Sequence, residues 1–238
     1  ERLCRVGVAK MMIRLGDVNR GVALALEGQD KECCRECAAL LEAPKQPASD
    51  KQHLGDAARL YEMAEMPEKA VAIHIKNKNW GALSPLMSKI TSPKLHSEFA
   101  KAKESEGAWQ EAAAAYEKAN DLDSVVRLLL AHLNQPPRAM QIVRETRSPQ
   151  GALLVAQHAQ EREDHRAAIE FLVLAKRPSE GFELASKHDE METFTTALNS
   201  QGTAEENRKV AGYYEAKGDA LRAGEFWFAT REYSRALR

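Results

Sequence analysis

The chain has 238 residues, of which 44% are hydrophobic and 29% charged, so it can bury a core and is not disordered by composition. Its 34 Lys and Arg side chains face 35 Asp and Glu side chains, and the formal net charge of −1 disfavours nucleic-acid binding, which needs a positive excess. The sequence holds no apolar run of about 18 residues that would suggest a membrane span, and no signal-peptide pattern. It starts at Glu1 rather than at Met and stops inside a helical pattern, so we expect it to be part of a longer protein.

The N-terminal third predicts short helices interrupted by one loop. Residues 1–28 predict a helix pair broken near Gly16, and residues 31–43 predict a further helix. The stretch 44–53 is rich in proline and polar residues, so it predicts a loop insertion that lengthens a hairpin turn. We expect this loop to be the most mobile of the chain.

From residue 91 onward the pattern becomes regular, with four short helices expected in one unit of about 55 residues. In the first complete unit they are predicted at 93–106, 108–119, 122–133 and 136–147. Ser92-Pro93 and Ser148-Pro149 are typical of an N-cap followed by proline in the first helical turn, and Pro67, Pro136 and Pro178 open further helices.

The turns between helices carry signals of their own. Gly107 and Gly218 stand between the first and second helices of their units, where a left-handed residue is wanted. The intervening unit has Glu163 at that position, so we expect a different turn there. Thr203 and Glu206 fit a capping box at the start of another helix.

A small–large–small triple at spacing i, i+4, i+7 marks one helix face in every unit, and successive copies are 55, 56 and 55 residues apart. The members are Ala57, Tyr61 and Ala64; Ala112, Tyr116 and Ala119; Ala168, Leu172 and Ala175; and Ala223, Trp227 and Thr230. A second set keeps the same period: Ala70, Val125, Gly181 and Ala236. Small residues let a neighbouring helix approach and the large one fills the groove, so we expect these residues to form the structural core of the repeat.

These patterns predict one fold class. We expect an all-α protein whose residues 1–238 form a single right-handed α-solenoid segment, built from about 17 short antiparallel helices in hairpins that resemble tetratricopeptide (TPR) repeats. Such an array exposes long concave and convex faces and has no preformed deep pocket.

No constellation of residues indicates catalysis, so we expect no enzyme activity, no cofactor and no metal. Cys33, Cys34 and Cys37 lie within five positions, but no second C-x-x-C and no paired histidines supply the remaining zinc ligands. Packing on a buried helix face is therefore favoured for these cysteines, and a reducing compartment fits them. No glycine-rich phosphate-binding loop is present in the sequence.

Two features leave an interaction role open. Trp80 follows the basic stretch that contains Lys76 and Lys78, so these three residues are candidates for contact with a partner, although packing beneath a turn is the favoured interpretation of the tryptophan. The two Ser-Pro pairs also resemble proline-directed phosphorylation sites, but helix capping explains both pairs without a kinase.

Several segments together resemble the WD-repeat subunits of intraflagellar transport complex A. The resemblance covers most of the chain from about residue 14 to 238 and departs from the family at 44–53. It rests on the order of many words: Arg14-Leu15-Gly16-Asp17, Lys78-Asn79-Trp80, Ser92-Pro93-Lys94-Leu95-His96, His132-Leu133-Asn134-Gln135-Pro136, Ala168-Ile169-Glu170-Phe171-Leu172-Val173 and Tyr233-Ser234-Arg235-Ala236-Leu237.

The resemblance implies a non-catalytic scaffold in cilia. Family members join WD-repeat propellers to a long helical solenoid, and the complex serves dynein-2-driven return transport and import of membrane cargo with a tubby-like adaptor. Its implied partners are the other complex A subunits, its implied location is the cilium, basal body and cytoplasm, and the family's zinc segment lies outside this chain. Two alternatives remain open at this point: a vesicle-coat or tethering subunit with the same propeller-plus-solenoid plan, and a TPR-type adaptor that binds peptides.

Overall fold

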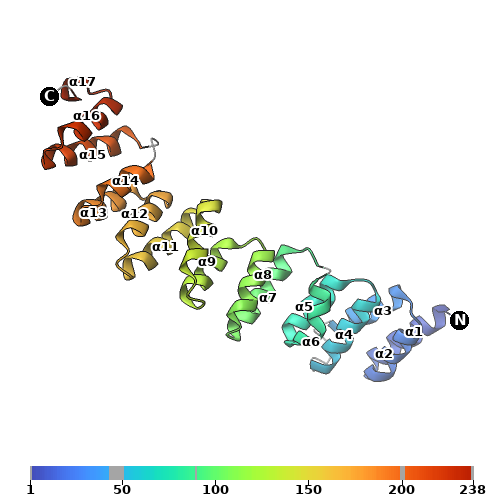
Figure 1. Ribbon diagram of the computed structural model, residues 1–238. Coiled ribbons are helices and arrows are strands. Elements are labelled where there is room, and N and C mark those ends of the chain that lie inside the picture. Colours follow the sequence, from blue (N-terminus) through green and yellow to red (C-terminus); the bar gives the residue numbers. More distant parts are fainter. Residues whose placement is uncertain (1, 43–50, 89, 199–201, 237–238) are drawn as a thin grey trace. The chain divides into compact units, whose positions relative to one another are not determined.

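The computed structural model of the protein describes residues 2–42, 51–88, 90–198 and 202–236. Within these ranges it contains seventeen α-helices and no strand, which confirms the predicted all-α fold and the expected number of helices (Figure 1). The helices group into two compact units, Glu1–Asp121 and Leu122–Arg238.

The first unit is a stack of helical hairpins. Its helices are α1 (Arg2–Arg14), α2 (Val18–Glu27), α3 (Lys31–Glu42), α4 (Lys51–Met63), α5 (Pro67–Asn77), α6 (Trp80–Met87), α7 (Pro93–Ser105) and α8 (Trp109–Lys118). Consecutive helices pack on each other from α1 to α6 and in the pair α7 and α8, and α1 also meets α3, α2 meets α4 and α5 meets α7. Each helix therefore contacts mainly its neighbours in sequence, as helices do in repeat arrays.

The second unit repeats this plan. Its helices are α9 (Leu122–Ala131), α10 (Pro136–Thr146), α11 (Pro149–Glu161), α12 (His165–Leu174), α13 (Pro178–His188), α14 (Met191–Leu198), α15 (Ala204–Lys217), α16 (Ala220–Ala229) and α17 (Tyr233–Ala236). Ile169 of α12, Phe194 of α14 and Val210 of α15 belong to one buried apolar cluster, so the core of this unit runs from helix to helix.

Proline and capping residues begin the helices as the sequence predicts. Pro67, Pro136 and Pro178 each open a helix, in α5, α10 and α13. The capping box of α15 is complete, since the Thr203 hydroxyl accepts from the Glu206 amide at 3.3 Å and the Glu206 carboxylate accepts from the Thr203 amide at 2.7 Å. These contacts satisfy backbone donors that the first turn of a helix leaves open.

The turns after the first helix of each hairpin are alike, which makes one prediction wrong. Gly107 and Gly218 have φ angles of 78° and 79°, and Glu163 has φ 60° at the equivalent position. The backbone hydrogen bonds also match: the Glu163 amide donates to Gln160 O at 3.1 Å, as the Gly107 amide donates to Glu104 O at 3.0 Å. Glu163 therefore adopts the left-handed turn without being glycine.

The same left-handed conformation recurs once per repeat at the next turn. Glu65, Asn120, Lys176 and Arg231 all have positive φ, between 55° and 64°, and they are 55, 56 and 55 residues apart. The left-handed turns thus recur with the same period of 55 to 56 residues as the side-chain triple.

The loop predicted at 44–53 is described only in part. Residues 44–50 lie outside the described residues, and residues 51–53 belong to α4, so the loop prediction is wrong for those three positions.

Candidate interaction surface

The residues of the repeat triple occupy three fixed places on α4, α8, α12 and α16. The large members Tyr61, Tyr116, Leu172 and Trp227 are buried, and so are Ala57, Ala112, Ala168 and Ala223. The third members Ala64, Ala119, Ala175 and Thr230 follow the last helical residue directly and are half-buried.

Two of the large members carry a hydroxyl group that must be satisfied. The Tyr61 hydroxyl donates to Glu42 Oε2 at 2.9 Å, and the Tyr116 hydroxyl donates to Glu104 Oε2 at 3.0 Å. Burial raises the pKa of the Tyr61 phenol well above its usual value, and the hydrogen bond to the Glu42 carboxylate raises it further. Tyr61 therefore stays neutral, and it serves packing rather than chemistry.

The candidate contact residues Lys76, Lys78 and Trp80 do not form one open patch. Trp80 is half-buried at the start of α6, where its indole Nε1 donates to Glu106 Oε1 at 3.2 Å. Its ring meets Phe99 edge-on, with centroids 5.6 Å apart, and Lys103 Nζ lies 4.5 Å from its centroid.

These contacts hold the tryptophan against α7, so its indole packs within the first unit rather than standing open to a partner. The Lys78 ammonium lies 3.7 Å from the same Glu106 carboxylate, whereas Lys76 is exposed and takes no part in this cluster. The two lysines therefore remain the accessible part of the predicted contact.

The cysteine cluster faces the core of the first unit. Cys33, Cys34 and Cys37 are buried free thiols on α3, and the Cys34 thiol donates to Ala25 O at 3.4 Å. Desolvation raises the pKa of all three thiols, and it raises the pKa of Cys37 to about 12. Since the thiolate is the nucleophile and the metal ligand, this environment favours packing over reactivity.

The two Ser-Pro pairs differ in how their hydroxyl groups are used. Ser148 Oγ accepts from the Gly151 amide at 3.2 Å and donates to Asp123 Oδ1 at 2.6 Å, so the capping prediction is confirmed for Ser148. Ser92 stands at the N-cap position of α7, but its side chain makes no capping hydrogen bond, so that prediction is wrong for the Ser92 hydroxyl.

Arginine–glutamate pairs link a helix to a later segment on the surface of the second unit, and the sequence analysis missed them. Arg144 Nε contacts Glu170 at 2.8 Å, Arg166 Nε contacts Glu190 at 2.8 Å, and Arg208 Nε contacts Glu232 at 2.6 Å. The arginine precedes its glutamate by 24 to 26 residues, a spacing that could have indicated contact between adjacent hairpins. Each pair joins an exposed arginine to a half-buried glutamate at the surface, where ion pairs contribute little to stability, so the pairs orient hairpins more than they stabilise them.

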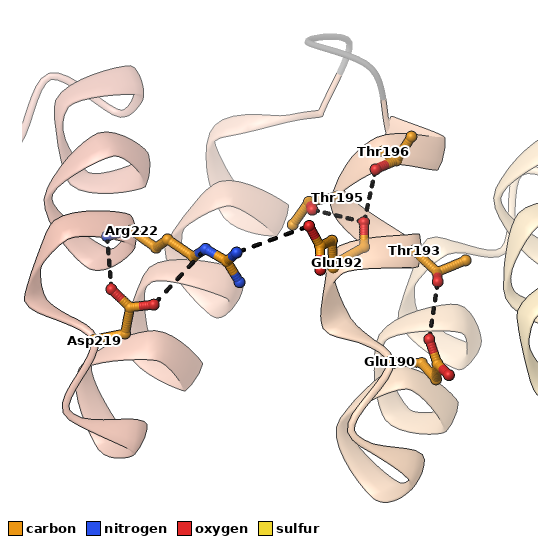
Figure 2. Close-up of polar contacts among 7 residues, drawn as sticks. All are labelled: Glu190, Glu192, Thr193, Thr195, Thr196, Asp219 and Arg222. Atoms are coloured by element: carbon orange, nitrogen blue, oxygen red, sulfur yellow. Dashed lines mark hydrogen bonds and ion pairs between the residues drawn. The ribbon is translucent and has the colours of Figure 1, made fainter.

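A further link of this kind joins α14 to α16. Figure 2 shows Arg222 between two carboxylates, with Nη2 3.7 Å from Glu192 Oε1 and Nε 3.7 Å from Asp219 Oδ2. Asp219 also caps α16 by accepting from the Arg222 amide at 3.1 Å. The same close-up shows the Thr193 hydroxyl donating to Glu190 at 3.0 Å, a contact between the first turn of α14 and the residue before it.

Two histidines stack on the surface of the second unit. The rings of His165 and His188 have centroids 3.5 Å apart and planes at 22°. Desolvation lowers the pKa of His188, and the neighbouring His165 lowers it further. His188 is therefore favoured in its neutral state, and its protonation in acid should weaken the stack.

Within the described ranges, no group of three or more His, Cys, Asp or Glu side chains is arranged to hold a metal ion. No described helix is long and apolar enough to cross a membrane. Each unit offers a helical surface that carries charged side chains, and such surfaces bind other proteins in repeat arrays.

Comparison with known proteins agrees with this architecture. A family model of the TPR domain of intraflagellar transport proteins 140 and 172 matches residues 46–236, which is most of the chain. The chain belongs to this family. The match confirms the resemblance to the intraflagellar transport family that the order of the sequence segments indicated.

Three relatives carry the same segment. The chain is 41% identical over 239 residues to WD repeat-containing protein 19 of Homo sapiens and 39% identical to the protein of that name in Mus musculus. It is 37% identical over 202 residues to WD repeat-containing protein dyf-2 of Caenorhabditis elegans. All of this chain aligns with the two mammalian relatives but spans only 17% of their length, and 85% of it aligns with 14% of the nematode protein.

Proposed function

We propose that this chain is a scaffold segment of intraflagellar transport complex A and acts through protein–protein contacts rather than catalysis. The observation that carries the proposal is the match of residues 46–236 to the intraflagellar transport TPR domain, together with the similarity of the whole chain to WD repeat-containing protein 19. Because the chain spans a small part of those relatives, the activity of the whole protein is part of the proposal.

The arrangement of the helices supports this role. Each unit stacks its hairpins through buried side chains, while the exposed side chains of the same helices remain accessible to partners. Many weak contacts along such a surface, repeated in an assembly, give strong binding without a deep pocket. The proposed partners are the other complex A subunits, with the tubby-like adaptor and the retrograde dynein engaged through the whole complex, and the proposed location is the cilium and basal body.

Lys76 and Lys78 are proposed to contact one of these subunits. Both side chains are exposed beside the turn from α5 to α6, and the structure holds that turn in place through the contacts of Trp80 with α7. A rigid turn that presents two ammonium groups suits an acidic surface on a partner.

The test is cross-linking of the full-length protein. The protein is captured from ciliated cells through a tag, treated with a lysine-reactive cross-linker and examined by mass spectrometry. Links from Lys76 or Lys78 to other complex A subunits are expected. Recovery of vesicle-coat subunits or of chaperones in place of complex A would overturn the assignment, and recovery of complex A with no link from residues 1–238 would overturn the scaffold role of this segment.

A charge reversal tests the contact itself. Because the double variant Lys76→Glu, Lys78→Glu also removes the two amines that the cross-linker needs, it is captured without cross-linker. The yield of co-purified complex A subunits should then fall while the fold is retained, because both side chains are exposed. Lys187→Glu, at an exposed position of α13 in the second unit, is the matched control and should leave the yield unchanged.

A further inference from the structure

A small apolar pocket interrupts the surface of the first unit between α6, α7 and α8. Its volume is about 200 Å³, and Met87, His96, Phe99 and Ala115 line its floor and walls. Nothing in the sequence pattern singled it out, because alanine is an ordinary residue of the repeat.

The pocket exists because one repeat lacks a side chain that the other repeats have. Ala115 is equivalent to Leu60 in the preceding repeat and to Phe171 and Phe226 in the following ones, at the steps of 55, 56 and 55 residues that relate all copies. Leu60 and Phe171 are fully buried, and Phe226 is half-buried, so in those repeats a large apolar group fills this place. At Ala115 only a methyl group is present.

The neighbouring residue of α7 does not close the gap. Phe99 stands where the following repeats have Val155 and Val210, so this repeat has the larger side chain at that position. The ring of Phe99 packs edge-on against Trp80, however, and it lines the pocket without filling it. The repeat therefore keeps an opening whose equivalent in the next copy holds the phenyl ring of Phe171.

The rim of the pocket carries one uncompensated positive charge. Glu111 lies on the rim, but its carboxylate is paired with the buried Lys103 ammonium at 2.8 Å. Lys118, in the last turn of α8, is exposed on the rim and forms no ion pair within the described part of the chain. A ligand that places an acidic group beside an apolar one would complement this rim.

We propose that this pocket, here named the Ala115 pocket, is a docking site for a phenylalanine or tyrosine side chain of a partner protein, with a neighbouring acidic residue of that partner paired to Lys118. A ring buried in such a pocket has the features of a binding hot spot, since aromatic anchors in desolvated pockets dominate interfaces. The inference deepens the proposed scaffold function by naming a contact of this chain. Its test does not depend on which assembly the chain joins.

The experiment uses the whole chain and a defined probe. Methyl groups of Met87 and Ala115 are observed by NMR while the acetylated, amidated tripeptide Asp-Phe-Asp is titrated, and the peptide Asp-Ala-Asp is the matched control. Saturable shifts of both methyl groups with the first peptide and none with the second are expected. Equal shifts with both peptides, or no shift with either, would overturn the proposal.

Two variants locate the ring. Ala115→Phe copies the residue that the next repeat uses and should weaken binding of the Phe peptide at least about tenfold, because the space is filled. Ala115→Leu, which copies Leu60, gives the same test if the larger ring disturbs folding, and circular dichroism reports whether each variant is folded. Undiminished binding to either folded variant would place the ring elsewhere and refute the assignment.

A third variant separates the rim from the pocket. Lys118→Glu should weaken binding of the acidic peptide about two- to fivefold and reverse its salt dependence, because a surface attraction becomes a repulsion. Lys187→Glu is the distant control and should do neither. If the peptides fail to bind while cross-links to complex A subunits are still found, the pocket proposal fails and the scaffold proposal stands.

Discussion

Replacing Tyr116 with alanine removes the largest side chain from the face of α8 that carries the repeat triple. The side chain is 2% exposed, and an aromatic residue of this kind buries about 150–250 Å² on folding. At about 25 cal/mol per Å² the lost burial amounts to about 4–6 kcal/mol, which is an upper value because the unfolded chain is itself partly compact. The site is flanked by Ala112 and Ala119, so little can move in to fill the space, and we expect a loss of about 3–5 kcal/mol.

A second substitution separates packing from the hydrogen bond. Tyr116→Phe keeps the ring and removes only the hydroxyl that donates to Glu104 Oε2, so it should cost about 1 kcal/mol. Leu15→Ala is the exposed control in the same unit, since Leu15 is 78% exposed, and it should change stability by less than about 0.5 kcal/mol.

Urea unfolding followed by circular dichroism measures these differences, and hydrogen exchange shows whether the loss centres on α7 and α8. The order expected is Tyr116→Ala far below Tyr116→Phe, with Leu15→Ala close to the unsubstituted chain. A Tyr116→Ala variant that loses less than the Phe variant would refute the assignment of this residue to the repeat core.

Three further predictions follow from the turns, the histidine pair and the cysteines. Glu163→Gly should stabilise the chain by about 0.5–1 kcal/mol in urea unfolding, because glycine adopts positive φ without steric cost, whereas Glu161→Gly in the last turn of α11 should destabilise it. Because the pKa of His188 is lowered in the folded chain, the unfolded chain binds more protons as the pH falls. The melting temperature should therefore decline below about pH 6.5, and His188→Gln should make this decline less steep. Cys37 should resist a thiol reagent at pH 8 until urea unfolds the chain, because burial raises its pKa to about 12; rapid labelling of the folded chain would contradict this.

The sequence predicted the repeat because its signals are redundant. The triple on α4, α8, α12 and α16, the opening prolines and the capping box of Thr203 all give helix positions independently, and all agree with the structure. The prediction of a different turn at Glu163 was wrong because it assumed that only glycine adopts a left-handed conformation there. The hydrogen bonds that close the turn, and the packing of the helices on each side, outweigh a left-handed cost of about 1–2 kcal/mol.

The surface was less predictable, for a different reason. Trp80 contacts Glu106, Phe99 and Lys103, which lie 19 to 26 residues further along the chain, and no local sequence pattern predicts such contacts. The Ala115 pocket likewise reflects the absence of a side chain, which becomes visible only when equivalent positions are compared with the space around them. The core of a repeat protein can be predicted from periodic patterns, whereas a surface site depends on positions that depart from the pattern.

The exposed arginine–glutamate pairs of the second unit give the stack a particular mechanical character. Arg144, Arg166 and Arg208 each link one helix to a later segment through a contact that water and salt can replace at little cost. Bending of neighbouring hairpins can therefore proceed by opening these links one at a time, while the apolar seam beneath them stays closed. Raising the ionic strength should therefore make the hairpins of the second unit easier to bend without unfolding them.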